Sequence, residues 1–299
     1  MLEAVGMAEG SSKSLDGIEL VAALCAAGSI AVLGLIIAFV VAEGAPALAS
    51  GILTLENRWE PEYDRYGLYT LLASSIAVAV GALAISVPAG ISSAVFVVEV
   101  LPPKLRDFVK VPIELLGAIP SVVYGFVGYK VIVPTISSAF GIYYGQTALA
   151  ASLVLAVMTV PTILSLSSEV LASVPLEYRE ASLALGATKW QTIRHVVLPT
   201  ATPGVLASIL LAFGRAIGET IAVVMVAGCP QQLSGPIWNL LQPVYPMTAA
   251  IVMGMGEAEI GSLHYHALFA IGGILLAFSF AVNAAASLIS RKASIRLRL

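Results

Sequence analysis

The sequence predicts an all-α integral membrane protein with six transmembrane helices. Of its 299 residues, 59% are hydrophobic and only 11% are charged, and the mean hydropathy is +0.95. A soluble domain carries about 25% charged residues, so this chain has too few charges to cover a water-exposed surface of its size. The net charge of −3 provides no basic face for a nucleic acid. The composition therefore excludes a soluble enzyme, a disordered chain and a nucleic-acid-binding protein.

Six apolar runs predict the membrane spans, because a helix needs about 20 apolar residues to cross the hydrocarbon core. They are 20–42, 68–98, 112–134, 147–166, 204–228 and 267–290. The first run exceeds the apolar region of a signal peptide, which has about 7–15 residues, so we expect a retained anchor helix. The second run has 31 residues. It is too long for one span, and we expect Pro88 and Gly90 to break it.

The connections differ in their content of Lys and Arg. With six spans, the two tails and every second loop lie on one side of the membrane, and they carry eleven Lys and Arg residues. The loops on the other side carry two. Cytoplasmic loops are enriched in Lys and Arg, so both termini are predicted to be cytoplasmic, and the protein multi-pass in the cell membrane. The predicted order is a cytoplasmic tail (1–19), the anchor helix (20–42), an extracytoplasmic loop (43–67), a five-span core (68–290) and a basic cytoplasmic tail (291–299). The core includes a cytoplasmic hairpin (167–202) and an extracytoplasmic loop (229–266).

A spaced pattern lies in the predicted cytoplasmic hairpin. It consists of Glu180-Ala181-Ser182, Gly186, Val196 and Leu198-Pro199. Small residues such as Ala181 and Ala187 would form one apolar face of a helix, and Gly186 permits a sharp turn or a close approach. Such a helix can fit a groove of another protein, with Arg179 and Glu180 at its edge. The alternative is a solvated hairpin, ended by Pro199, that only joins two spans.

This pattern resembles the EAA loop of ABC-importer permeases, which reads EAA, three residues, Gly, nine residues, Ile, one residue and Leu-Pro. The chain differs by Ser182 for the second Ala and by Val196 for Ile. The resemblance implies a type I ABC-importer fold, in which the hairpin docks on an ATP-binding subunit and transmits its motion to the spans. The residues that this coupling would involve are Arg179, Glu180, Ala181, Gly186, Ala187, Leu198 and Pro199.

Two charged residues lie inside the fifth apolar run. Arg215 follows Gly204 by 11 residues, which places it about 17 Å into the membrane. Glu219 follows at i+4, on the same face of a helix. Each charge costs at least about 2.5–3.5 kcal/mol there unless it is paired, bound to a ligand or open to water. Gly214 and Gly218 have small-xxx-small spacing, which predicts the close approach of another backbone.

These charges allow two interpretations. In the first, Arg215 and Glu219 neutralise each other and hold helices together. In the second they form an anion site, because the planar guanidinium matches the oxygens of a tetrahedral anion. The carboxylate can accept a hydrogen bond only from an anion that still carries a proton, as phosphate does at neutral pH and sulfate does not. An anion site of this kind would favour phosphate.

Two segments, 214–228 and 112–128, closely resemble permease subunits of the high-affinity phosphate ABC importer, the Pst system. The segment 247–272 and the chain length resemble its PstC-type subunit, and the resemblance extends over about 66–289. It implies that the charged pair is critical for transport. It also implies a second, PstA-like permease subunit, two ATP-binding subunits that carry ATP and Mg²⁺, and an extracytoplasmic phosphate-binding protein as partners.

Ser121 and Tyr124 are further candidates for the substrate pathway. They follow Pro120 in the third run, where a proline frees a backbone carbonyl and nearby hydroxyls can line a polar path. A simple helix kink is the alternative.

The sequence contains no P-loop and no nucleophile–base pair. We therefore expect no enzymatic activity and no cofactor in this chain, with ATP hydrolysed by other subunits. No metal site is expected either, because the two cysteines have no metal-ligand spacing. Two alternatives remain: an ABC permease for another oxyanion, such as sulfate or molybdate, and an ion-driven secondary carrier. The carrier would use Arg215 and Glu219 as a proton relay and would leave the hairpin pattern unexplained.

Overall fold

The computed structural model describes residues 2–296, and these residues are mainly helical. Six described helical segments are long and apolar enough to cross a membrane, which confirms the predicted number. They are Glu19–Ala49, Leu68–Val100, Ser121–Phe140, Ala148–Ala172, Lys189–Gly218 and Leu263–Leu288.

The elements run along the chain as follows. The helices are α1 (Leu2–Ala49), α2 (Leu68–Val95), α3 (Pro103–Gly117), α4 (Ser121–Val127), α5 (Val133–Phe140), α6 (Ala148–Ala172), α7 (Leu176–Ala184), α8 (Lys189–Thr192), α9 (Leu198–Gly218), α10 (Ile221–Ala227), α11 (Met247–Met255) and α12 (Leu263–Arg296). Three π-helical segments, Phe96–Val100, Gly128–Ile132 and Ile193–Val197, follow α2, α4 and α8. A small sheet has the strand order β1 (Leu53–Thr54), β3 (Arg65–Gly67), β2 (Trp59–Glu60), and a 3-10 turn covers Pro61–Tyr63.

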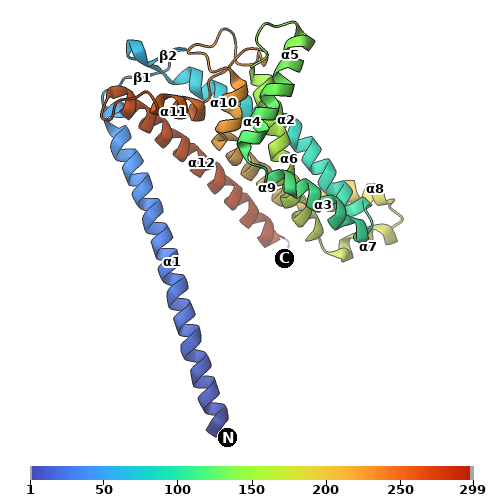
Figure 1. The fold of residues 1–299 in the computed structure, drawn as a ribbon. Coiled ribbons are helices and arrows are strands. Elements are labelled where there is room, and N and C mark those ends of the chain that lie inside the picture. Colours follow the sequence, from blue (N-terminus) through green and yellow to red (C-terminus); the bar gives the residue numbers. More distant parts are fainter. Residues whose placement is uncertain (1, 297–299) are drawn as a thin grey trace.

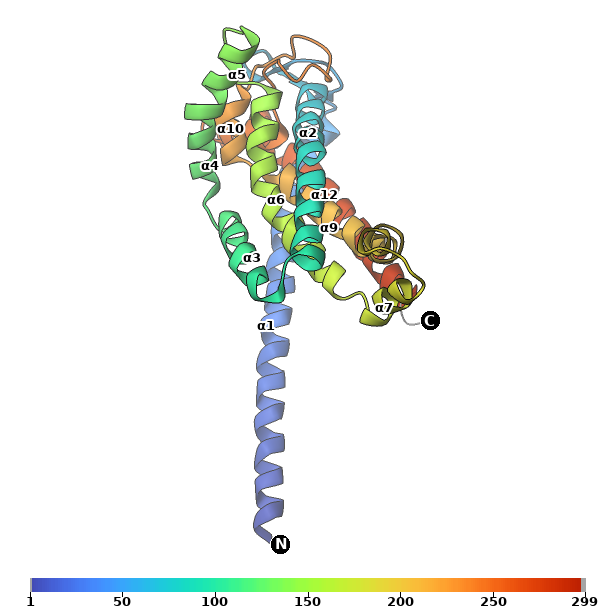
Figure 2. The same cartoon turned by 90° about the vertical axis from the view of Figure 1, so that its right-hand side faces the viewer.

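The centre of the bundle is formed by α2, α6 and α9 (Figures 1 and 2). Small residues allow α2 and α6 to approach closely. A Cβ atom at Gly81 would lie 2.4 Å from the Ser152 hydroxyl, and one at Gly90 would lie 2.7 Å from Ile163. The Ser152 hydroxyl also donates a hydrogen bond to the carbonyl oxygen of Val78 at 3.2 Å. This packing makes α6 the most buried of the spans, with 61% of its apolar window buried.

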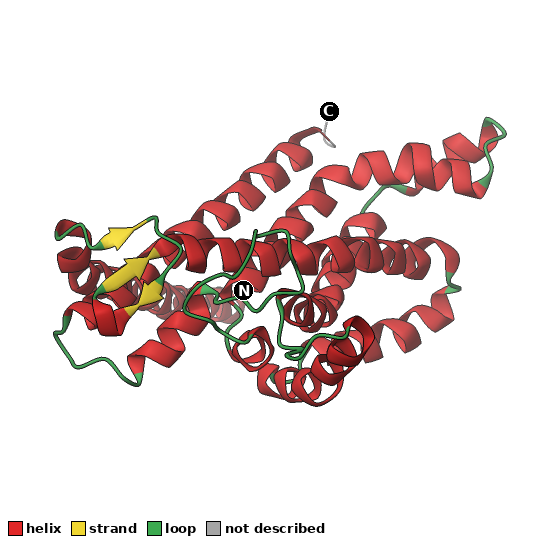
Figure 3. Ribbon diagram, turned by 90° about the horizontal axis from the view of Figure 1, so that it is seen from above, coloured by secondary structure: helices red, strands yellow, loops and turns green. Residues whose placement is uncertain are grey.

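The two ends of the bundle differ. The three strands, α11 and α5 lie at one end, and α7 and α8 lie at the other (Figure 1). Viewed from above, the strands lie to one side of the helices (Figure 3). The beginning of α1 and the end of α12 both extend toward the side of α7 (Figure 2). Because six is an even number of crossings, both ends of the described chain lie on the same side of the bundle, which is the side of α7 and α8.

The first helix extends away from the bundle, and its main contact is with α12 (Figure 1). The contact includes Phe39 and Phe269, whose ring centroids are 5.5 Å apart, and Gly44, where a Cβ atom would lie 2.9 Å from the Ala270 backbone. No residue in the apolar window of this span is buried. The helix begins at Leu2, so the described part of the predicted tail 1–19 is helical.

Pro88 does not break the second span, contrary to the expectation from its length. The helix runs through Pro88 and continues as a π-helical segment to Val100, which gives one span of 33 residues. At about 1.5 Å per residue this span is about 50 Å long, so it extends beyond the hydrocarbon core toward α7. Pro88 is tolerated because neighbouring helices can satisfy the backbone group that a proline frees in a membrane.

The third and fifth apolar runs are each interrupted. A break at Ala118–Pro120 separates α3 from α4, so this span begins at Ser121 instead of Pro112. The residues Glu219 and Thr220 separate α9 from α10, so 204–228 is not one helix. The fifth run was expected to be continuous, whereas the break in the third run lies at the expected proline, Pro120. Both interruptions place irregular backbone within the membrane region.

The hairpin ends differently from the prediction. Pro199 lies in the first turn of α9, where a proline is tolerated because the missing N–H would have no helical partner. The span Lys189–Gly218 therefore passes through Pro199 without a stop. At the C-terminal end, α12 includes residues 291–296 of the predicted basic tail. The remaining tail residues, 297–299, lie outside the described residues.

Candidate functional site

Arg215 lies on an exposed face near the end of α9. Its Nη1 atom is 3.5 Å from the Thr162 hydroxyl of α6, and its charge acts on the Tyr124 phenol of α4. Among the described residues it forms no ion pair with a carboxylate. A guanidinium group that is exposed, charged and without a counter-ion in the described part of the chain remains available for an anion.

Glu219 does not share a helix face with Arg215. The helix ends at Gly218, and Glu219 has extended backbone angles, φ −70° and ψ 132°. Its carbonyl oxygen accepts a hydrogen bond from the Thr248 hydroxyl of α11 at 3.0 Å, which stabilises the interruption. The described ion pairs do not include Arg215–Glu219. The interpretation of a mutually neutralised helical pair is therefore wrong for this conformation.

Tyr124 bridges the interruption between α3 and α4. Its phenol donates a hydrogen bond to the carbonyl oxygen of Leu116 at 2.7 Å, near the end of α3. Ser121 is the first residue of α4, directly after Pro120. The prediction that Pro120 interrupts the helix and frees a carbonyl beside a hydroxyl is thus confirmed. The structure brings Tyr124 toward Arg215 and shows no hydrogen bond from the Ser121 side chain among the described ones.

The glycines of α9 differ in their surroundings. A Cβ atom at Gly214 would lie 3.4 Å from the Asn283 side chain of α12, which is ordinary contact, and one at Gly218 would meet nothing within 4 Å. The close approach of a second backbone at both positions is therefore not found within the described chain. The tight helix contact lies instead at Gly125, where a Cβ atom would be 2.7 Å from the Met225 sulfur and 3.0 Å from the Ala222 Cα atom of α10.

The Gly125→Ala variant should lower the stability of the protein by about 1–3 kcal/mol, because the added methyl group overpacks the α4–α10 contact. The matched control is Gly218→Ala, which adds the same group in open space. Thermal unfolding of the purified complex in detergent measures the difference. Equal midpoints for the two variants would show that the α4–α10 contact is not tight.

The predicted coupling hairpin consists of α7 and α8. Gly186 has φ +83° in the turn between them, a conformation that side chains rarely adopt. Glu180, Ala181 and Gly186 are exposed, and Ala187 is half-buried. The Ser182 hydroxyl lies 2.9 Å from the Thr192 hydroxyl, which joins the two helices. The hairpin therefore presents an exposed face that includes Glu180, Ala181 and Gly186, next to a turn whose backbone conformation favours glycine.

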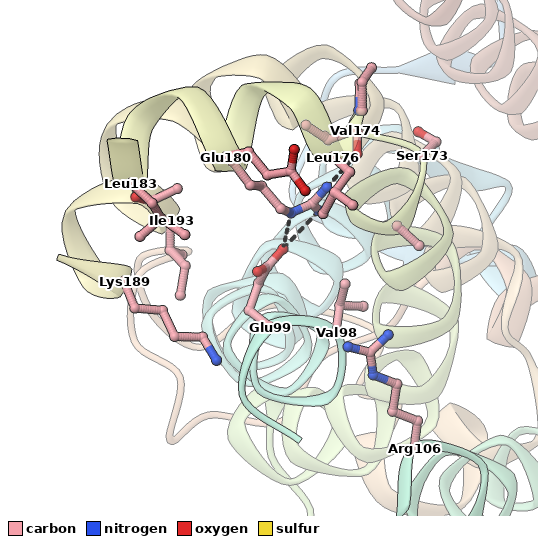
Figure 4. Close-up of a pocket in the computed structure, with 14 residues that line it drawn as sticks. Val98, Glu99, Arg106, Ser173, Val174, Leu176, Glu180, Leu183, Lys189 and Ile193 are labelled. Atoms are coloured by element: carbon pink, nitrogen blue, oxygen red, sulfur yellow. Dashed lines mark hydrogen bonds and ion pairs between the residues drawn. The ribbon is translucent and has the colours of Figure 1, made fainter. Parts of the chain in front are cut away.

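Arg179 does not lie at the edge of this face. Its guanidinium binds Glu99, the single acidic residue of the α2 span, with Nη2 to Oε1 at 2.8 Å and Nε to Oε1 at 3.2 Å. Figure 4 labels Glu99 and draws these contacts as dashed lines. It also donates hydrogen bonds to the carbonyl oxygens of Leu171 and Val174. The two side chains are only 16% and 10% exposed. The pair connects the hairpin to α2, in the wall of a cavity of about 810 Å³.

Sequence reasoning missed Glu99 and Thr162. A single carboxylate at the end of a long apolar run is a signal for Glu99, because such a charge needs a partner. No comparable signal identifies Thr162, since it is one of several hydroxyl residues in its helix.

Comparison with known proteins agrees with this architecture. Residues 86–295 match the family model described as "Binding-protein-dependent transport system inner membrane component". The probable ABC transporter permease protein YqgH of Bacillus subtilis is 38% identical over 239 residues, which cover 78% of this chain and 76% of YqgH. The phosphate transport system permease protein PstC of Xylella fastidiosa strain 9a5c is 35% identical over 245 residues, which cover 76% of this chain and 74% of PstC.

The fold also matches a solved importer. An inward-facing structure of the MetNI methionine ABC transporter aligns with a TM-score of 0.54 and 19% identity, covering 76% of this chain and 94% of that chain. At this identity the match shows the fold alone, which is that of the type I ABC-importer permeases. Such permeases are multi-pass inner-membrane transport subunits that work with ATP-binding and substrate-binding proteins. The chain therefore belongs to the family of binding-protein-dependent transport system inner membrane components.

Proposed function

We propose that this chain is a permease subunit of an ATP-driven ABC importer for inorganic phosphate. The observation that carries the proposal is the guanidinium of Arg215, which has no ion-pair partner among the described residues and lies beside the interruption between α9 and α10. The chain also has relatives named as phosphate transport permeases. Transporters commonly build substrate sites at discontinuous helices near the middle of the membrane. A permanent positive charge at such a place supports a tetrahedral anion as the substrate.

The orientation that fits this role has both termini and the hairpin in the cytoplasm. The excess of Lys and Arg on that side supports it. The opposite end, with the strands and α11, would then face outward and receive a substrate-binding protein. Two ATP-binding subunits would contact the exposed face of α7 and α8.

A second permease subunit, of PstA type, would complete the pathway. The exposed charge of Arg215 supports a protein surface around it rather than lipid alone, because a charge facing lipid is costly. The helix α4 also exposes Val122, Val123 and Phe126 by 51%, 45% and 54%. A second cation supplied by that subunit would balance a divalent phosphate.

Transport would follow from closure of the ATP-binding subunits. Their motion would displace α7, and the Arg179–Glu99 pair would carry that displacement to α2. The spans would then rock around Arg215 and open the pathway to one side at a time. Arg215 would hold the phosphate oxygens during this change, and the interruptions before α4 and α10 would supply mobile, polar backbone beside the anion.

Uptake of radiolabelled phosphate tests the proposal. Cells that lack their own importer would receive the genes for the whole complex, and excess unlabelled sulfate would serve as the competitor. We expect rapid phosphate uptake that sulfate does not reduce. Uptake that sulfate suppresses would identify a permease for another oxyanion.

The Glu219→Gln variant should lose part of the preference for phosphate over sulfate. The wild-type carboxylate repels a fully deprotonated anion and accepts a hydrogen bond from one that retains a proton, whereas the amide can donate to either. Competition of unlabelled sulfate against labelled phosphate measures this preference, with Glu219→Asp as the control that keeps the charge. An unchanged preference in Glu219→Gln would remove Glu219 from anion selection.

A further inference from the structure

The strands and α11 lie at the end of the bundle opposite α7 and α8 (Figure 1). A second cavity lies among these elements. Its volume is about 450 Å³, and it is formed by the strand region, the loop before α11, α11 itself and the start of α12. It is separate from the Arg215 face, since none of its lining residues belongs to α4, α6 or α9.

The floor of this cavity is aromatic. Trp59 and Tyr245 are buried, with 2% and 7% of their surfaces exposed. The rings of Trp59 and His264 lie 6.4 Å apart, and Tyr66 lies behind them with its centroid 5.3 Å from that of Trp59. The Nε2 atom of His264 is buried and has no hydrogen-bond partner among the described atoms. The floor therefore consists of buried aromatic side chains and one unsatisfied polar atom.

The rim of the cavity is acidic. Glu62 and Glu257 are exposed lining residues, and neither forms an ion pair or a side-chain hydrogen bond with a described residue. Two other carboxylates at this end are paired, since Glu60 contacts Arg65 at 3.7 Å and Glu43 contacts His266 at 3.5 Å. The described lining contains no Lys or Arg. The cavity thus carries two free negative charges.

Two further titratable lining residues, Cys229 and Tyr245, add no charge. Burial raises the pKa of the Cys229 thiol to about 12. Burial, together with Cys229 and Glu257, raises the pKa of the Tyr245 phenol to about 12. Both groups are therefore neutral at physiological pH. The surrounding segments 43–67 and 229–266 carry seven acidic residues and two basic ones, so the whole surface is acidic.

An aromatic floor under a carboxylate rim binds cations. Trp and Tyr faces attract ammonium and guanidinium groups, and the attraction increases when the cation leaves water. The same charges repel phosphate, so this cavity is not on the path of a free anion. The geometry points to a docking pocket for a Lys or Arg side chain of the extracytoplasmic substrate-binding protein. The identity of this partner rests on the proposed function. Two features favour this partner. The acidic surface around the cavity would complement a basic face of the binding protein, and the cavity lies at the end that would face outward.

The affinity of the binding protein for the assembled complex tests this inference. The complex would be placed in lipid nanodiscs, and binding of the substrate-binding protein would be measured over a range of salt concentrations. We expect the Glu62→Gln/Glu257→Gln double variant to bind about tenfold more weakly at low salt, with a smaller salt dependence than wild type. The matched control is Glu259→Gln, an exposed carboxylate two residues away that does not line the cavity.

Charge exchange identifies the occupant directly. A Glu257→Lys variant should bind the wild-type binding protein poorly, and a Lys→Glu or Arg→Glu substitution at one position of the binding protein should restore its affinity. The inference is overturned if the double variant binds like the Glu259→Gln control. It is also overturned if the double variant instead loses the second permease subunit, since the cavity would then belong to the interface between permeases.

The affinity measurement contains no transport step. If the wild-type complex carried an anion other than phosphate, the proposed substrate would be wrong while the loss of affinity in the double variant would still stand. If phosphate uptake were confirmed and the affinity did not change, only the docking pocket would be wrong.

Discussion

Replacing Arg215 by Gln should abolish phosphate uptake by the assembled transporter, with a loss of about 100-fold or more. The reason is that the guanidinium has no counter-ion in the described chain, so its charge is available to offset the desolvation of the anion. The amide of Gln retains a polar group of moderate size but provides no charge. The measurement is the initial rate of labelled phosphate uptake in cells, with the amount of protein in the membrane determined in parallel.

Two control variants separate the charge of Arg215 from its shape. Arg215→Lys keeps the charge but loses the planar fork, so we expect partial uptake. Thr162→Val removes the neighbouring hydroxyl at 3.5 Å and should change uptake by only a few-fold. Full uptake by Arg215→Gln, with normal assembly, would make Arg215 a structural residue and direct attention to Tyr124.

Breaking the pair between Arg179 and Glu99 should have the second large effect. Both side chains are largely buried, and removing one partner of a buried ion pair costs about 3–5 kcal/mol because the other charge is left uncompensated. We expect Glu99→Gln and Arg179→Gln each to reduce uptake strongly, because the hairpin would lose its connection to α2. The Glu99→Gln/Arg179→Gln double variant should recover part of the stability, since neither charge remains buried alone.

Two readouts distinguish coupling from simple instability. Thermal unfolding measures stability, and the ratio of transported phosphate to hydrolysed ATP measures coupling. We expect this ratio to remain low in the double variant even where stability recovers. The control is Lys110→Gln, which removes the partner of Glu114 in a more exposed pair at 3.4 Å and should change little. A normal ratio in the double variant would contradict a coupling role for the Arg179–Glu99 pair.

Most of the fold could be predicted because lipid imposes a simple rule on composition. Each apolar run corresponds to a span, and the break at Pro120 follows from the loss of a backbone donor. The same argument failed at Pro88, where tight packing against α6 maintains the helix. It also failed at Glu219, because no proline marks the interruption. Its extended backbone is held instead by Thr248, which is 29 residues away in the sequence.

The candidate site was predictable only in part, because contacts between residues far apart in the sequence leave no local pattern. An arginine in an apolar run is conspicuous in a sequence, so Arg215 could be found without a structure. The partner of Arg179 could not, because Glu99 lies 80 residues earlier and reaches the hairpin only through the length of α2. The acidic cavity near α11 likewise combines Glu62 with Glu257, and no local pattern connects these two residues.

Reconstituted proteoliposomes provide the most direct test of the central claim, that this chain forms an ATP-driven phosphate pathway. They would contain the complete complex, with ATP on the side of the ATP-binding subunits and phosphate-loaded binding protein on the other side. Phosphate uptake should require both and should persist when an uncoupler collapses the proton gradient. Uptake that continues without ATP and follows the proton gradient would contradict the claim and identify a secondary carrier.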